Sequence, residues 1–297
     1  MNSFNNYELP PYPTTSQIIT EKYPLTKSFT PKLPSQTPSN LLSRSISPYW
    51  LHLSTLRDEF KFNETYKQNI KILSKIFCGW KRIRGDGNCY YRSVISTYLQ
   101  KIFHFNQPVS RIFDFLAQLH PVSLDPSHKF YFDFAKVYET INELYLQKIN
   151  STYKVKVEIF FRVLDLLQDE KFDLMLIGLA RAMTDSLIYS PAGAYINEFT
   201  TPDEIRSLHY RILEMGMEAE GVELSLLPKA LNIEVTQVNI FGDQILYTNY
   251  PEETGFSEKI KINIISKSRG HYDSLYSIQD MEDEDYSLRT GSYMIDI

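Results

Sequence analysis

One short stretch, residues 84–93, constrains the fold more than any other part of the chain. It reads Arg-Gly-Asp-Gly-Asn-Cys-Tyr-Tyr-Arg-Ser, so two glycines, an acid, an amide and a cysteine lie within one turn. Apolar residues at helical spacing follow it, which predicts a helix from Cys89 to roughly Phe103. A cysteine on the first turn of a helix lies in the positive field of backbone N–H groups, which favours thiolate over thiol. The stretch therefore predicts a nucleophile, with loop N–H groups pointing at an oxyanion beside the sulfur.

A second cluster of polar residues lies near the other end of the chain. The residues from His271 to Tyr276 follow a turn at 267–270 and are predicted to form a strand. Residues i and i+2 of a strand share a face, so His271 and Asp273 project the same way, with Cβ atoms about 6–7 Å apart. That spacing suits an imidazole held by a carboxylate on one nitrogen and facing a thiol with the other. The histidine lies 182 residues after the cysteine, as expected when nucleophile and base come from separate elements.

Together, residues 86–93 and the Gly-His-Tyr-Asp-x-Leu-Tyr segment resemble the two motifs of the ovarian-tumour (OTU) family of ubiquitin-cleaving cysteine proteases, in particular its otubain branch, peptidase family C65. The resemblance implies an α+β, papain-like fold in which a central twisted β-sheet is packed between helical lobes. By the same resemblance, Cys89 is the nucleophile, His271 the general base and Asp273 the acid that orients it. Asp86 matches a further active-site acid, and we expect it to shape the loop rather than contact His271. Gly85 stands where otubains often carry proline, so we expect a looser entry to the loop.

The resemblance also implies an activity and its partners. The expected reaction is hydrolysis of the isopeptide bond between the ubiquitin C-terminus and a lysine, by a monomer that needs no cofactor. Ubiquitin and polyubiquitin chains are the expected partners, and a ubiquitin-conjugating enzyme is a further one. Two alternatives stay open: a non-catalytic binder of ubiquitin or a conjugating enzyme that inhibits ubiquitin transfer, and a protease for a ubiquitin-like modifier.

Composition excludes several other classes of function. The formal net charge is −5 and no long Lys/Arg stripe is present, which argues against nucleic acid as a partner. No apolar run approaches the ~20 residues that span a bilayer, and the first residues do not resemble a secretory signal. With Cys78 and Cys89 as the two cysteines, we expect free thiols in a reducing compartment, the cytoplasm or also the nucleus. No two histidines lie at metal-ligand spacing, so no metal site is expected.

The chain is expected to divide into three parts. Residues 1–53, rich in Pro, Ser and Thr, are predicted to be a mobile arm, because repeated proline interrupts regular structure and little apolar area is available for burial. Residues 54–277 are the predicted catalytic domain, and residues 278–297 an acidic tail. A capping box at Thr201–Glu204 predicts a helix start. A narrow channel for the substrate tail is expected between residues 218–229 and the glycine-rich stretch 84–93, which is called the elbow from here on. Periodicity predicts helices at about 54–77, 128–149, 154–168 and 173–189, a loop at 104–127, and strands at about 233–240, 259–265 and 271–276.

Overall fold

The computed structural model describes residues 44–47, 50–60, 63–251, 259–267 and 270–280. Within these residues one six-stranded sheet forms, in the spatial order β1-β2-β6-β5-β3-β4. Neighbouring strands are antiparallel except β3 and β5, which are parallel. The strand that begins with His271 therefore lies in the interior of the sheet, bonded on both sides. The strands are β1 (Leu51–His52), β2 (Phe77–Lys81), β3 (Glu234–Phe241), β4 (Gln244–Tyr250), β5 (Lys261–Lys267) and β6 (His271–Ser277).

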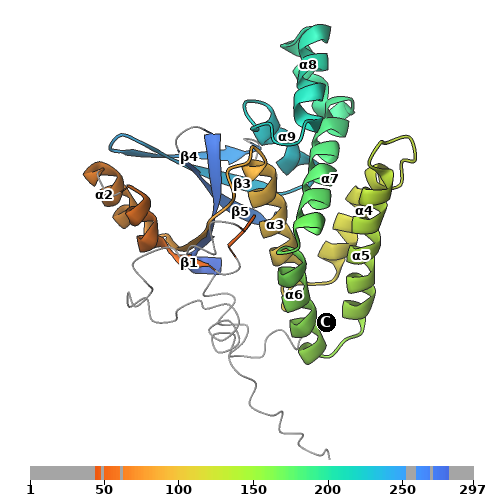
Figure 1. Cartoon of the computed structure of the whole chain (residues 1–297), viewed down its shortest axis with the longest axis horizontal. Helices are drawn as coiled ribbons and strands as arrows, with labels where there is room; N and C mark the ends of the chain where they lie inside the picture. The colour runs from red at the N-terminus through yellow and green to blue at the C-terminus, as the bar shows by residue number, and fades with distance from the viewer. Residues whose placement is uncertain (1–43, 48–49, 61–62, 252–258, 268–269, 281–297) are drawn as a thin grey trace, which may run out of the picture.

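Helical elements cover the two faces of the sheet (Figure 1). One core lies between the sheet and α3, α4, α5 and α7, and the other lies between the sheet and the short segments η2 and α2. Strand β5 shows the division, because Ile264 contributes to the first core and its neighbour Ile265 to the second. The predicted sheet between helical lobes is thus confirmed. The helices are η2 (Leu53–Phe60), α2 (Glu64–Leu73), α3 (Cys89–Phe103), α4 (Ser110–Ser123), α5 (Tyr131–Ile149), α6 (Tyr153–Leu166), α7 (Glu170–Ile188), η3 (Pro191–Glu198), α8 (Pro202–Leu213) and α9 (Glu223–Ala230).

Helix α3 positions the nucleophile because it is the central helix of the larger core. Apart from Lys101, every one of its residues is buried, and it packs against β6, α6 and α7. The predicted helix start at Thr201 is confirmed, with both hydrogen bonds of the capping box formed between Thr201 and Glu204. None of the helices in the described part of the chain is both long enough and apolar enough to cross a membrane.

Two of the predicted elements are wrong. The segment 104–127, predicted as a loop, contains the helix α4, in which Pro121 lies close to the C-terminal end. The helix predicted over 54–77 ends at Leu73, and Phe77 starts the strand β2 instead. Every residue of β2 is buried, since the strand lies between β1 and β6 and is covered on both faces. A strand buried on both faces loses the alternation of polar and apolar residues by which a strand is recognised.

The boundaries of the folded domain also differ from the predicted ones. Ile46 forms a β-bridge to Ile83 and is 2% exposed, and β1 pairs with β2, so residues 44–47 and 50–53 of the predicted arm are part of the fold. Proline density predicted the arm, but it carries no information about backbone pairing with a distant strand. At the other end, Asp280 forms an ion pair with Lys101 beyond the predicted limit at 277. The remainder of the predicted arm and tail, residues 1–43, 48–49 and 281–297, lies outside the described residues.

Candidate active site

The glycine-rich elbow holds Cys89 at the start of α3, where its thiol is nearly buried at 3% exposure. Gly87 has φ +77°, and a Cβ there would lie 1.7 Å from the carbonyl oxygen of Gly216. Only glycine fits this position, because both the left-handed backbone and the close approach exclude a side chain. The side-chain oxygen of Asn88 accepts a hydrogen bond from the Gly216 N–H at 2.9 Å. The elbow is therefore clamped against the segment that precedes α9, with the first N–H groups of α3 next to the sulfur.

The imidazole beside the thiol belongs to His271, the first residue of β6. His271 Nε2 lies 3.0 Å from Asp273 Oδ1, and the imidazole also hydrogen-bonds the Cys89 thiol. Burial lowers the pKa of His271, but the hydrogen bonds to Asp273 and Cys89 and the charges of both groups outweigh burial and raise the pKa to about 9. The imidazole therefore stays protonated at neutral pH. His271 and Asp273 thus lie on the same face of β6, as their spacing predicts, and Cys89 of α3 lies beside the imidazole.

Gly85 lies against the other edge of the imidazole. A Cβ at this position would be 3.1 Å from His271 Nδ1, closer than most side-chain contacts. The nitrogen that is not held by Asp273 therefore has just enough space beside the elbow backbone. A side chain at residue 85 would require the ring to move by a few tenths of an ångström. Glycine at position 85 thus leaves space for the His271 ring, and a larger residue would fill part of that space.

Asp86 points to the other side of the elbow. Its hydrogen-bond partners in the described part of the chain are Arg84, Asn88 and Arg92, and the last forms a two-point fork at 2.7 and 2.8 Å. Burial would raise the pKa of Asp86, but the fork with Arg92 and the N–H of Asn88 lower it to about 2. The carboxylate is therefore charged at all physiological pH values and fixes the shape of the loop. The structure thus brings Cys89, His271 and Asp273 together and places Asp86 with the groups that support the elbow.

Comparison with known proteins identifies the family. The model of the family described as Peptidase C65 Otubain matches residues 35–277, which is most of the chain. The chain belongs to the otubain family. Its relatives include the mouse protein named ubiquitin thioesterase OTUB2, which is 24% identical over 251 residues, covering 82% of this chain and 99% of the mouse protein. The human protein of the same name is 24% identical over 249 residues, covering 82% and 98%.

Solved structures show the same fold. A ceOTUB1 chain, in a complex with ubiquitin aldehyde and UBC13~Ub, superimposes on this otubain with a TM-score of 0.65, at 16% identity over 79% of this chain and 94% of that one. The chain in the h/ceOTUB1–ubiquitin aldehyde–UBC13~Ub complex gives a TM-score of 0.61, at 16% identity over 79% and 91%. At this level of identity the likeness establishes the architecture, an α+β otubain domain.

Sequence reasoning missed a buried arginine that supports the elbow of this otubain. Arg181 of α7 is 1% exposed, and its guanidinium donates to the carbonyl oxygens of Gly87 (3.1 Å) and Met217 (2.6 Å) and to the side-chain oxygen of Asn88 (2.8 Å). It also stacks on the ring of Tyr91, 4.3 Å from the centroid. One side chain thus joins the elbow to the segment before α9. No sequence signal marks Arg181, because its partners are brought to it by three different elements.

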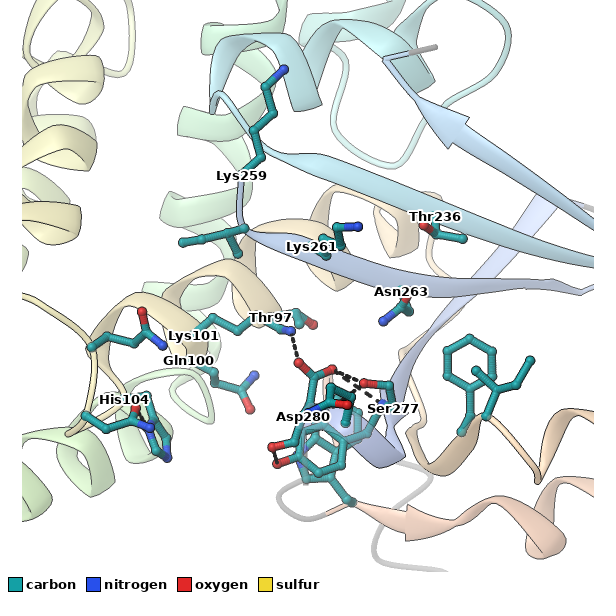
Figure 2. Close-up of a pocket in the computed structure, with 18 of the residues that line it drawn as sticks. Thr97, Gln100, Lys101, His104, Thr236, Lys259, Lys261, Asn263, Ser277 and Asp280 are labelled. Carbon is teal, nitrogen blue, oxygen red and sulfur yellow. Dashed lines mark hydrogen bonds and ion pairs between the residues drawn. The ribbon is translucent and has the colours of Figure 1, made fainter. Parts of the chain in front are cut away.

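The large hollow in Figure 2 is a separate feature. It has a volume of about 620 Å³ and lies at the C-terminal end of α3, where Lys101, Lys259 and Lys261 line it together with Asp280. None of the four predicted site residues lines this hollow. No group of three His, Cys, Asp or Glu side chains within the described ranges has the geometry of a metal site.

Proposed function

We propose that this otubain is a thiol-dependent deubiquitinase that hydrolyses the isopeptide bond between the ubiquitin C-terminus and a lysine. The observation that carries the proposal is the position of the His271 imidazole, which hydrogen-bonds both the thiol of Cys89 and the carboxylate of Asp273. A protonated imidazole beside a thiol stabilises the thiolate, which is the nucleophile. The family match over residues 35–277 and the relatives named ubiquitin thioesterase support ubiquitin as the acyl group.

The reaction proceeds by acyl transfer in two stages. The Cys89 thiolate attacks the carbonyl carbon of the terminal glycine of ubiquitin, and the carbonyl electrons move to the oxygen. N–H groups at the start of α3 receive that oxyanion. When the C–N bond breaks, the His271 imidazolium gives its proton to the lysine amine, and a thioester remains on Cys89. Neutral His271 then takes a proton from water, whose oxygen attacks the carbonyl carbon of the thioester. The C–S bond breaks, so that ubiquitin leaves with a free carboxylate and the Cys89 thiolate is regenerated beside the His271 imidazolium. Asp273 keeps the ring oriented and stabilises its charged form.

Ubiquitin and a ubiquitin-conjugating enzyme are the proposed partners. Support comes from the two solved complexes, in which proteins of the same fold are bound to ubiquitin aldehyde and to UBC13~Ub. Cys78 and Cys89 form no disulfide, which supports a reducing compartment, so the proposal includes the cytoplasm or the nucleus as the location. A monomer is the state we propose for the enzyme.

A ubiquitin that carries a C-terminal electrophile tests the proposal. The full chain is expected to form a covalent adduct, and Cys89→Ala is expected to abolish it. Cys78→Ala is the matched control, because this second thiol is 5% exposed in β2, donates to the carbonyl oxygens of Tyr276 and Ser277, and is expected to leave the adduct unchanged. An adduct that survives Cys89→Ala, or no adduct at all with intact protein, would contradict the proposal. Binding without an adduct would instead favour the non-catalytic inhibitor.

Cleavage assays distinguish the remaining alternative. Fluorogenic C-terminal amides of ubiquitin and of ubiquitin-like modifiers are offered side by side to the same preparation. The proposal requires the highest kcat/KM with ubiquitin. Preferred cleavage of a ubiquitin-like modifier would keep the chemistry of Cys89 and His271 but replace the substrate.

A further inference from the structure

A lysine with a nearly buried side chain forms an ion pair with the carboxylate of Asp273, on the oxygen that does not contact His271. Lys267 is the last residue of β5 and pairs in register with His271 across the antiparallel ladder of β5 and β6. Its side chain is 9% exposed, and its ammonium forms ion pairs with Asp273 Oδ2 and with Glu59 of η2. The ammonium also lies over the ring of Trp80, 4.6 Å from its centroid. Three partners from three elements thus hold this cation in place.

The two oxygens of Asp273 have different surroundings. Oδ1 accepts from the backbone N–H of Ile83 at 2.8 Å and from His271 Nε2 at 3.0 Å. Oδ2 has no hydrogen bond of good geometry in the described part of the chain, and its polar contact there is the ion pair with Lys267. Asp273 itself is fully buried. Water therefore does not stabilise the charge on Oδ2, and the ammonium does.

The groups that face Asp273 define its electrostatic environment. They are the imidazole on β6, the ammonium of Lys267 on β5, and the phenol of Tyr66 on α2, whose pKa is raised by burial first and then by the charges of Glu59 and Asp273. Burial alone would raise the pKa of Asp273, and Lys267 and His271 together hold it below its usual value. Without the ammonium, a buried carboxylate loses its main compensation and takes up a proton on Oδ2. A neutral carboxyl group still accepts a hydrogen bond on Oδ1, but it no longer stabilises an imidazolium.

We propose that Lys267 is a positioning residue of the active site: by neutralising Oδ2 it keeps Asp273 ionised, and so keeps His271 protonated beside Cys89. The proposal rests on the proposed cysteine chemistry, which gives the charge of His271 its purpose. The ammonium of Lys267 contacts Asp273, Glu59 and the ring of Trp80, so Lys267 is proposed to act through Asp273. Glu59, 28% exposed at its side chain, holds the ammonium from the solvent side and is replaceable by water.

The test measures the titration of the His271 ring by NMR, with histidine labelled in the ring and the signal assigned from its loss in His271→Asn. In the intact chain the midpoint is expected near pH 9. Lys267→Met is expected to lower it by at least one pH unit, a tenfold loss of imidazolium at a given alkaline pH. Lys267→Arg restores the charge and is expected to bring the midpoint back to within a few tenths of a unit. Glu59→Gln is the matched control, expected to leave the midpoint unchanged.

A second background keeps the test decisive if Lys267→Met does not fold. In Asp273→Asn no buried carboxylate is left unpaired, and there Lys267→Met is expected to cause no further change in the midpoint. A midpoint that stays near pH 9 in folded Lys267→Met, or a shift of the midpoint by Lys267→Met within the Asp273→Asn background, would overturn the proposal. The readout needs no ubiquitin, so a protein that fails to cleave ubiquitin refutes the proposed function without affecting this result. If ubiquitin is cleaved, the loss in Lys267→Met is expected in kcat rather than in KM, because the lysine is proposed to act on the charge of His271 through Asp273.

Discussion

Replacing Arg92 by methionine tests whether the buried charges behind the elbow are mutually dependent. Arg92 is fully buried, and its guanidinium bridges Asp86 at 2.7 and 2.8 Å and Asp173 at 3.0 and 3.1 Å. Methionine fills a similar volume but leaves the carboxylate of Asp173, which is 2% exposed, without its cation. Breaking a buried pair from one side costs about 3–5 kcal/mol. Asp86 is partly exposed, so water compensates for most of the interaction that it loses with Arg92. We therefore expect Arg92→Met to lower the free energy of unfolding by about 4 kcal/mol.

Urea unfolding at pH 7, followed by the fluorescence of the buried Trp80, measures this loss. The double variant Arg92→Met/Asp173→Asn is expected to recover about half of it, because no unpaired carboxylate remains in the core. The loss in Arg92→Met should also shrink between pH 8 and pH 5. Burial raises the pKa of Asp173 even beside Arg92, so without Arg92 the carboxylate takes up a proton more readily as the pH falls, and the penalty for burying its charge disappears.

Two results would refute this reasoning. One is a loss below about 1 kcal/mol in Arg92→Met, which would mean that the bridge contributes no more than a surface pair. The other is a double variant no more stable than the single one, which would assign the loss to packing rather than to the unpaired charge. Ubiquitin cleavage measured on the folded fraction adds a further readout, since the fork on Asp86 shapes the elbow that holds Cys89.

Three further predictions concern the site and the scaffold. The alkaline limb of kcat/KM, measured with a fluorogenic ubiquitin amide, is expected near pH 9. The pKa of His271 is raised to about 9, so the imidazole is protonated below that pH and neutral above it. An alkaline limb near pH 7 would contradict this expectation. Gly87→Ala is expected to abolish cleavage and to lower the midpoint of urea unfolding far more than Gly221→Ala does. Both glycines have positive φ, but a Cβ at residue 87 would lie 1.7 Å from backbone, whereas one at residue 221 meets nothing within 4 Å. Equal effects of the two substitutions would show that backbone strain from positive φ, and not the steric clash, decides the outcome. Thr201→Ala is expected to cost about 1 kcal/mol in urea unfolding through loss of the capping box, with unchanged cleavage per folded molecule.

Much of the site could be predicted because its two halves are local patterns. The helix start at Cys89 depends on the glycines beside it, and the shared face of His271 and Asp273 depends only on the alternation of a strand. Likewise the helix at Thr201 is specified within four residues. These features require no knowledge of distant neighbours, so the residues themselves specify them.

Other features depend on which elements become neighbours. Strand β2 could not be recognised, because burial between β1 and β6 removes its alternation. The same applies to Ile46, which forms a β-bridge to Ile83 and lies with it in the larger core. In each case the determining contact lies far away in the sequence, where periodicity carries no signal.

The sequence by itself determined where the potentially reactive groups lie in their local structure: a thiol at a helix start and an imidazole two residues from a carboxylate. The tertiary structure decided which charges these groups meet. Lys267 reaches Asp273 because β5 pairs with β6 in one particular register, and Arg181 reaches the elbow because α7 crosses behind it. The physical reason is that nucleophile and hydrogen-bond geometry follow from local backbone conformation, whereas the charge state of a buried group depends on every element packed around it.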